Sequence, residues 1–355
     1  MQRKRATKAS SRDFAPAPSY GSLGFLARAI TAPLRRAEPK RRLSLALQGG
    51  GSFGAFTWGV LDRLLEEEEL ELDTVSGASA GAVNAVILAS GLAAGGRAEA
   101  RQRLERFWMR VSDVAPAIRF GRAANDSAAL AVDLLTRFVS PYQLNPLKLD
   151  PLRDCLADLV DFERLRADSP VRLVIAATRV KTGQPRFFRA SDITLEAVLA
   201  SACLPLLRHA VEIEGEWYWD GGYSANPPLR QLVLESSADD ILLVQLTPET
   251  LEQLPLLSPD IARRMNQITF NGPLHREVEA LADLRAMSRR DGLFRSRFCR
   301  KLQRLRLHRI AAEDEVDGLD RASALTIDRA FFLRLKESGR AAADRWLAGP
   351  PPNAG

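Results

Sequence analysis

The chain alternates between short runs of aliphatic residues and longer segments whose apolar residues recur at helical spacing. Continuous aliphatic and β-branched runs of this length are typical of strands that a sheet buries on both faces. Such runs occupy residues 42–48, 73–76, 171–177 and 241–246. Helical patterns occupy residues 55–65, 82–89 and 97–111. The alternation predicts an α/β fold in which helices separate buried parallel strands.

Ser79 lies at the centre of a Gly-x-Ser-x-Gly pentapeptide that joins the second predicted strand to an Ala-rich helix. Gly77 and Gly81 allow a sharp strand-to-helix turn, because residues without side chains tolerate a close approach of neighbouring chain. Ser79 would then stand at a helix N-terminus, where free N–H groups and the helix dipole favour negative charge. The pentapeptide alone is a weak pattern, but in this context it predicts a nucleophilic serine.

The first predicted strand runs directly into Gly49, Gly50 and Gly51, and Gly54 follows before the next helix. Acyl transfer develops negative charge on the carbonyl oxygen of the substrate, and backbone N–H groups can stabilise it. A loop without side chains can turn several N–H groups toward one bound oxygen. Gly49, Gly50 and Gly51 are therefore the candidate oxyanion donors.

A serine is a poor nucleophile unless a base takes its proton. An aromatic strand pattern at residues 217–219 ends in Asp220, and Gly221 and Gly222 follow. Asp-Gly-Gly by itself is more often a plain turn. The bulky residues before it indicate a packed strand end that presents the carboxylate to a cleft, so Asp220 is the candidate base.

These three motifs, in this order, resemble those of the patatin-like phospholipase family, from about residue 42 to about residue 234. The resemblance includes the Asn-Pro-Pro segment that begins at Asn226. It implies a three-layer α/β/α fold with a mainly parallel central sheet. It also implies a Ser-Asp dyad of Ser79 and Asp220, with the three consecutive glycines as the oxyanion hole. The residues that support the motifs are Gly54, Gly77, Gly81, Gly221 and Gly222.

Phe53 stands where many family members carry Lys or Arg, so no extra positive charge is expected beside the oxyanion loop. The same glycines also fit a dinucleotide-binding fingerprint, which needs an acidic residue at the end of the second strand. Glu69, Glu71 and Asp73 instead precede that strand or begin it, which disfavours a dinucleotide. No Gly-Lys-Ser or Gly-Lys-Thr follows the glycines, which disfavours a phosphate-binding loop.

A Ser-His-Asp esterase is the mechanistic alternative, because the chain contains His209, His275 and His308. Only the last two follow Asp220, which is the order of an α/β-hydrolase triad. A non-enzymatic membrane-binding protein on the same fold is the alternative from another class. The intact Ser79 and Asp220 argue against that alternative.

Composition fits a globular enzyme without a metal or an organic cofactor. The 355 residues, 46% of them hydrophobic, suffice for one large domain or two small ones. Cys155, Cys203 and Cys299 are odd in number and lack metal-ligand spacing, as expected of free thiols in a reducing compartment. Basic residues without stacking aromatic residues give little support for nucleic-acid binding. We therefore expect no metal, no cofactor and no nucleic-acid partner.

Positive charge is concentrated near the N-terminus. The first 42 residues hold eleven Lys or Arg against Asp13 and Glu38, a charge of +9, although the whole chain carries only +6. Residues 23–30 form a short, weakly amphipathic stretch within this region. One hypothesis is peripheral contact with an anionic membrane surface. The other is a disordered or targeting leader. Without a secretory signal or a stretch of spanning length, a cytoplasmic location is expected.

We expect four regions: a basic, disordered leader (1–41), a patatin-like catalytic domain (42–250), a mainly helical extension packed on that domain (251–348) and a disordered tail (349–355). Within the extension, residues 305–310 form a strand pattern. Residues 112–149 carry no motif, and a lid or acyl-chain pocket is the hypothesis for them.

The expected activity is hydrolysis of carboxylic esters in lipids. Phospholipids and lysophospholipids are the first candidates for the substrate, and neutral glycerides and storage polyesters are the alternatives. The sequence does not determine the head group, the acyl position or the oligomeric state.

Overall fold

The computed structural model describes residues 40–120, 150–251, 253–290, 296–316, 319 and 326–349. The expected leader, most of the segment 112–149 and almost all of the expected tail therefore lie outside the described residues. The chain divides into a unit of Met1–Lys40 and a compact unit that begins at Arg41. The described helices and strands all belong to the second unit.

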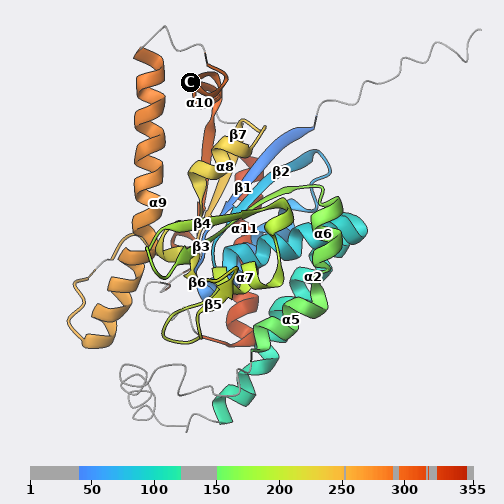
Figure 1. The fold of residues 1–355 in the computed structure, drawn as a ribbon, viewed down its shortest axis with the longest axis vertical. Coiled ribbons are helices and arrows are strands. Elements are labelled where there is room, and N and C mark those ends of the chain that lie inside the picture. The colour runs from blue at the N-terminus through green and yellow to red at the C-terminus, as the bar shows by residue number, and fades with distance from the viewer. Residues whose placement is uncertain are drawn as a thin grey trace, which may run out of the picture. The chain divides into compact units, whose positions relative to one another are not determined.

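A mixed, mainly parallel sheet forms the centre of this unit (Figure 1). Its strand order is β5-β6-β3-β2-β1-β7-β8, and β4 pairs with β3. The strands are β1 (Arg41–Leu47), β2 (Leu70–Gly77), β3 (Arg172–Arg179), β4 (Pro185–Arg189), β5 (Val211–Ile213), β6 (Glu216–Asp220), β7 (Asp240–Gln245) and β8 (Arg306–Ala311). Neighbours among β3, β2, β1, β7 and β8 are parallel, whereas β4, β5 and β6 pair antiparallel. The aliphatic runs and the pattern at 305–310 are confirmed as β1, β2, β3, β7 and β8.

The helices are α1 (Gly54–Leu64), α2 (Ala80–Phe120), α5 (Pro151–Leu159), α6 (Phe162–Asp168), α7 (Leu195–Ser201), α8 (Leu229–Glu235), α9 (Ser258–Arg290), α10 (Arg297–Arg304) and α11 (Arg329–Ala348). Short 3₁₀ turns include η1 (Gly51–Phe53) after β1 and η3 (Gly221–Tyr223) after β6. The three expected helices are confirmed as α1 and the two parts of α2. Non-helical backbone at Gly95 and Gly96 separates those two parts.

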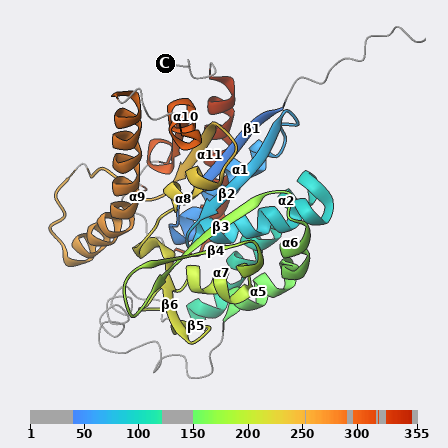
Figure 2. The same ribbon diagram turned by 45° about the horizontal axis from the view of Figure 1, so that its top comes forward.

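Alternate residues of β1 enter two separate cores on opposite faces of the sheet. Leu43, Leu45 and Leu47 join the core that contains residues of α1, α2 and α11. Ala46 joins the core that contains residues of α8, α9 and α10. Helices therefore cover both faces of the sheet (Figure 2), and the expected three-layer α/β/α fold is confirmed.

Described elements after residue 251 contribute to the same sheet and to its helical layers. β8 pairs with β7, and α11 packs closely against α1. Among the described helices, none combines the length and the apolar character that a membrane crossing needs.

Candidate active site

Ser79 occupies the turn between β2 and α2 and is buried. Its backbone has a φ of +52°, a left-handed conformation that costs a non-glycine residue about 1–3 kcal/mol. The Ser79 N–H donates to Ser201 at the end of α7, to Oγ at 3.0 Å and to the carbonyl oxygen at 3.2 Å. Gly81 permits the turn because a Cβ there would lie 2.1 Å from the Leu47 carbonyl oxygen. The surrounding chain therefore imposes the sharp turn expected at Ser79.

The Gly-rich loop and the Ser79 turn leave the sheet side by side. β1 and β2 are parallel and pair Leu47 with Gly77, so the residues that follow them are neighbours. A Cβ on Gly49 would lie only 2.7 Å from the Cβ of Ser79. The loop expected to bind an oxyanion thus lies against the candidate nucleophile.

The three candidate oxyanion donors are not equivalent. The Gly49 N–H donates to Asn226 Oδ1 at 2.7 Å, so it is already engaged. For the N–H groups of Gly50 and Gly51, no acceptor is found among the described residues. Gly51 also lines the same cavity as Ser79. Among the three candidate oxyanion donors, the N–H groups of Gly50 and Gly51 are therefore the ones without a protein acceptor in the described residues.

Asp220 is the last residue of β6 and is completely buried. β6 runs antiparallel to β3 and pairs Asp220 with Ala177, near the carboxyl end of β3. Asp220 Oδ1 accepts the Gly222 N–H at 2.8 Å. Oδ2 meets no donor of suitable distance and angle in the part of the chain that the structure describes. One oxygen of a buried carboxyl is therefore left for another partner.

Burial raises the pKa of Asp220 from 3.8 to about 7, opposed by the Ser79 hydroxyl, the Gly222 N–H and the charge of Arg208. Because the Ser79 hydroxyl affects this carboxyl, the two side chains are close neighbours, although no well-aligned hydrogen bond joins them. Catalytic hydrogen bonds are often long before substrate binds. A carboxyl whose pKa lies near neutral pH can act as a general base.

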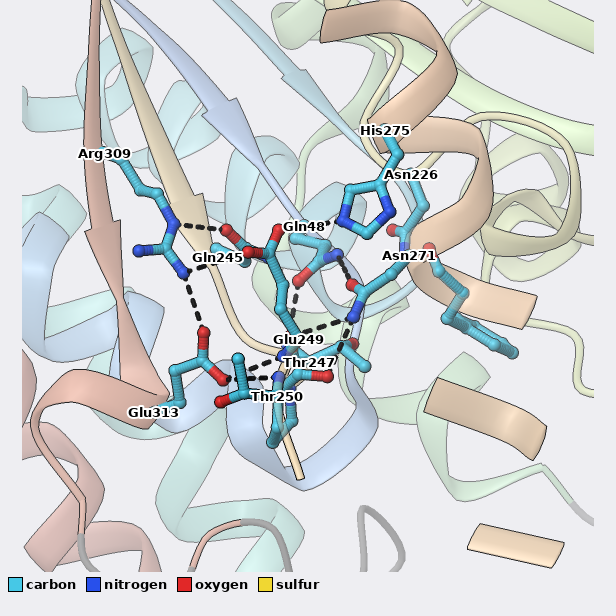
Figure 3. A network of polar contacts seen from close by, with 12 residues as sticks. Gln48, Asn226, Gln245, Thr247, Glu249, Thr250, Asn271, His275, Arg309 and Glu313 are labelled. Carbon is cyan, nitrogen blue, oxygen red and sulfur yellow. Dashed lines mark hydrogen bonds and ion pairs between the residues drawn. The ribbon is translucent and has the colours of Figure 1, made fainter. Parts of the chain in front are cut away.

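Buried amide side chains hold the Gly-rich loop against the end of β7 and against α9 (Figure 3). Gln48, which follows β1, accepts the N–H groups of Leu246 and Thr247 at 2.7 and 2.8 Å. The Gln48 amide group donates to Asn271 Oδ1 on α9 at 2.9 Å. The sequence could have indicated Gln48 as a residue of the site, because it is a polar residue at the end of an aliphatic strand pattern. No sequence pattern marks Asn271.

Asn226 connects the Gly-rich loop and the loop after Asp220 to α9. Its Oδ1 accepts the Gly49 N–H, and its Nδ2 donates to the Phe270 carbonyl at 3.1 Å. The Phe270 ring lies 5.0 Å from the Tyr223 ring, in the turn that follows Asp220. The Asn-Pro-Pro segment marks Asn226 in the sequence, but only the structure indicates what the side chain positions.

Two of the three histidines contact other carboxylates. His275 Nε2 lies 2.9 Å from Glu249 Oε1 (Figure 3). His308 Nε2 lies 2.7 Å from Asp240 Oδ1. Asp240 is at the amino end of β7, whereas the candidate base lies near the carboxyl ends of the parallel strands. These are the histidines that follow Asp220 in the chain. The described contacts therefore give no support to a triad in α/β-hydrolase order.

Ser79 lines a cavity of about 1210 Å³, which is large for a small-ligand site. Its apolar wall includes Val83, Phe107, Trp108 and Val111 of α2 and Leu152 of α5. Arg110, Arg153 and Arg208 also line the cavity, and each is paired with a carboxylate. His209 belongs to the same lining. The cavity offers apolar surface for an acyl chain, and its arginines are balanced by carboxylates of the same lining.

The two buried cysteines do not offer a rival nucleophile. All three are free thiols, and Cys155 and Cys203 are buried. Burial raises the pKa of Cys203 to about 12, which keeps it in the unreactive thiol form. Within the described residues, no group of three or more His, Cys, Asp or Glu side chains is arranged to hold a metal ion.

The sequence is similar to those of known proteins. A family model described as patatin-like phospholipase matches residues 45–233. The uncharacterized protein YjjU of Escherichia coli (strain K12) is 26% identical over 224 residues, 62% of this chain and 56% of the relative. A cGAMP-activated phospholipase of Escherichia coli (strain TW11681) is 28% identical over 214 residues, 54% of each chain. The chain spans about half the length of the curated relatives it matches.

Two solved structures are similar to this chain at low sequence identity. VipD from Legionella pneumophila has a TM-score of 0.44 at 15% identity, covering 88% of this chain and 67% of its own. ExoU from Pseudomonas aeruginosa, in its complex with SpcU, has a TM-score of 0.36 at 18% identity, covering 88% of this chain and 52% of its own.

Proposed function

Because the chain belongs to the patatin-like phospholipase family, we propose that it hydrolyses carboxylic esters of lipids through an acyl-enzyme on Ser79. The observation that carries this proposal is the pairing of a strained, buried serine with Asp220. That carboxyl has a pKa of about 7, and its Oδ2 meets no donor among the described residues. A buried acid left incompletely satisfied is expensive to maintain, which argues for a functional role.

In the first half-reaction, Asp220 takes the proton of the Ser79 hydroxyl while Oγ attacks the ester carbonyl carbon. The carbonyl oxygen becomes an oxyanion, and the N–H groups of Gly50 and Gly51 stabilise it. The N-terminus of α2 adds positive potential at the same place. The protonated Asp220 then gives its proton to the leaving alcohol as the carbon–oxygen bond breaks.

In the second half-reaction, a water molecule replaces the alcohol. Asp220 removes a proton from this water as it attacks the acyl carbon, and the same two N–H groups stabilise the second oxyanion. Collapse of this intermediate breaks the bond to Ser79, which recovers its proton from Asp220. The products are a carboxylic acid and an alcohol.

The proposed substrates are phospholipids and lysophospholipids, with neutral glycerides and storage polyesters as competitors of the same chemistry. The apolar wall of the cavity suits an acyl chain. Arg110, Arg153 and Arg208 are the candidate contacts for an anionic head group, which would have to compete with the carboxylates paired with them. His209 supports a second candidate mechanism, in which a histidine in the cavity acts as the base.

A lipid panel assayed with purified protein tests the proposal. Wild type should release fatty acid, and a fluorophosphonate probe should label Ser79. Ser79→Ala should abolish both while the far-ultraviolet circular dichroism stays unchanged. Asp220→Asn should lower turnover by about two orders of magnitude or more, the usual effect of removing a general base.

His209→Gln is the matched control, because it alters a polar side chain in the same cavity. It should keep most of the activity and the labelling. Labelling of a different serine, or turnover by Ser79→Ala equal to wild type, would exclude the proposed nucleophile. Loss of labelling in folded His209→Gln would instead assign the base to the histidine.

A further inference from the structure

The first half of α9 and the residues before it expose several large apolar side chains that lie close together in the chain. This α9 apolar face consists of Leu254, Leu256, Leu257, Ile261, Met265 and Ile268, which are between 42% and 81% exposed. Single exposed apolar residues are normal on a protein surface, but a contiguous set marks an interaction site.

The helical part of this set lies on one side of α9. Leu257, Ile261, Met265 and Ile268 are spaced by four, four and three residues, which places them in one row along a helix. The next turns carry buried residues, among them Asn271. The helix is therefore amphipathic at its start, with its apolar side turned to solvent rather than to the core.

α9 bends along its length, and its first part stands clear of the sheet and of the other described helices (Figures 1 and 2). Pro273 lies inside the helix, where it removes one backbone hydrogen bond and favours a bend. Only the residues from about Leu274 onward pack in the core beneath α9. The exposed start of the helix is thus not needed to complete that core.

The apolar face is followed along α9 by residues that contact the Gly-rich loop and the loop after Asp220, although none of the described residues of α9 lines the cavity. Ile268 is followed by Phe270 and Asn271, which contact Asn226 and Gln48 respectively. Through these contacts the helix touches both the loop after Asp220 and the Gly-rich loop. A surface that binds the start of α9 therefore lies next to the catalytic loops.

The charges beside the apolar face suit phospholipid head groups. Between Leu254 and Ile268 the described charged residues are Asp260, Arg263 and Arg264. Arg263 is paired with Asp260. Arg264 donates to Gln267 Oε1 and to the Glu249 carbonyl oxygen, so neither arginine faces a free carboxylate. The net charge of this stretch is positive, and no unpaired carboxylate interrupts the apolar row. An amphipathic helix of this kind buries its apolar face by roughly 5–10 Å in the boundary between head groups and acyl chains.

We propose that the α9 apolar face binds the surface of a phospholipid membrane and holds the catalytic cavity against its substrate. This inference rests on the proposed lipid hydrolysis, because that activity requires access to aggregated lipid. The side chains of the face enter the lipid boundary, while Arg263 and Arg264 stay at the level of the phosphates. The short connection from Ile268 to Phe270 and Asn271 then keeps the catalytic loops beside the membrane.

The test compares Met265→Asp with Met287→Asp in the full chain. Both methionines lie on α9 and are almost equally exposed, at 63% and 61%, but only Met265 belongs to the apolar face. Binding is measured by co-sedimentation with vesicles of phosphatidylcholine containing one-fifth phosphatidylglycerol, in a Ser79→Ala background that leaves the lipid intact. The measurement is made at about 1 M salt, where the Debye length is only about 3 Å, so that attraction between basic segments and the anionic lipid is suppressed.

Met265→Asp should weaken vesicle binding by roughly tenfold or more, because burial of a methionine is lost and a charge must be desolvated. Met287→Asp should bind within about twofold of the parent chain. In chains that keep Ser79, both methionine variants should hydrolyse a water-soluble short-chain ester as wild type does. This activity establishes that the variants are folded.

Equal vesicle binding by the two variants would overturn the inference. A concentration-dependent dimer that Met265→Asp dissociates, seen by analytical ultracentrifugation, would assign the face to a second copy of the chain instead. A wild type that binds vesicles through this face but hydrolyses no ester would contradict the proposed function and leave the membrane contact standing.

Discussion

Asp220 combines complete burial with only one hydrogen-bonded oxygen, and the candidate chemistry depends on that combination. An exposed aspartate would be ionised at neutral pH but too weak a base to help a serine. A buried aspartate with several donors would be a stronger acid still. Burial without such donors raises the pKa of Asp220 to about 7, which matches its proton affinity to the reaction.

The raised pKa predicts how activity depends on pH. In the proposed mechanism only the ionised form of Asp220 accepts the proton of Ser79, so kcat/KM for a water-soluble ester should rise with pH and reach half its plateau near pH 7. Initial rates measured across pH 5 to 9 with a single buffer series check this. A plateau that persists unchanged below about pH 5 would contradict the raised pKa. His209→Gln should leave the midpoint in place.

The raised pKa of Asp220 also makes the free energy of unfolding depend on pH. Between 3.8 and about 7 the folded chain binds the Asp220 proton and the unfolded chain releases it. The contribution of Asp220 to the free energy of unfolding is therefore greatest below pH 4 and is lost as pH rises through 7. In urea denaturation, Asp220→Asn should show a smaller fall in this free energy between pH 5 and pH 8 than wild type.

Gln48, Asn226 and Asn271 position the backbone of the site through buried hydrogen bonds. Each is completely or almost completely buried, and each uses its amide group to fix backbone near Ser79. A buried amide network is stable only when its members are satisfied, so it specifies one arrangement. This arrangement fixes the path of the Gly-rich loop.

At the scale of elements, α1 and α11 approach each other through glycine. A Cβ on Gly59 of α1 would lie 2.0 Å from the Lys336 carbonyl oxygen, and one on Gly339 of α11 would lie 2.2 Å from the Phe56 carbonyl oxygen. No flexible side chain can relieve such a contact, because both partners are backbone atoms. The two helices can pack this closely only with glycine at these positions.

Gly339→Ala should therefore lower the free energy of unfolding by about 1–3 kcal/mol, the typical cost of overpacking. Gly272→Ala on α9 is the matched control, because the nearest atom to its Cβ would be Arg276 Nη1 at 3.4 Å. That substitution should change stability by about 1 kcal/mol or less, toward greater stability, since alanine favours a helix. Urea denaturation followed by circular dichroism compares the two. Equal effects would exclude the close packing of α1 and α11.

At the scale of the whole molecule, charge is divided between two parts of the chain. The region through residue 42 carries +9, which leaves the remainder at −3. The chain also divides structurally at Arg41, where the compact unit begins. Basic residues near an anionic surface contribute about 1 kcal/mol each, but salt screens this attraction. We therefore expect the basic leader and the α9 apolar face to respond differently to salt.

A chain shortened to begin near Pro39 should bind anionic vesicles less tightly than the full chain at low salt and equally well at about 1 M salt. It should unfold at the same temperature and hydrolyse a water-soluble ester at the same rate. Vesicle binding across a salt titration makes the comparison. Identical curves for the two chains would leave the leader as a targeting or disordered segment.

The sequence by itself determined the elements and the order of the motifs. Aliphatic runs specify buried strands because side-chain period and burial are local properties of the chain. The glycines around Ser79 specify a sharp turn for the same reason, since the conformational freedom of glycine depends on nothing distant. The strands β1, β2, β3, β7 and β8 could be predicted in this way, whereas the three-layer arrangement was implied by the resemblance to the patatin-like phospholipase family.

Only the tertiary structure decided which of these residues meet. Asp220 approaches Ser79 because β6 runs antiparallel beside β3, and its pKa follows from burial that no local pattern encodes. Gly49 differs from Gly50 only because Asn226, far along the chain, accepts its N–H. Met265 has the spacing of a core residue yet faces solvent, because the start of α9 extends past the packed core. Contacts between segments that are distant in the chain determine all three features. A sequence pattern identifies the segments but does not show which of them are in contact.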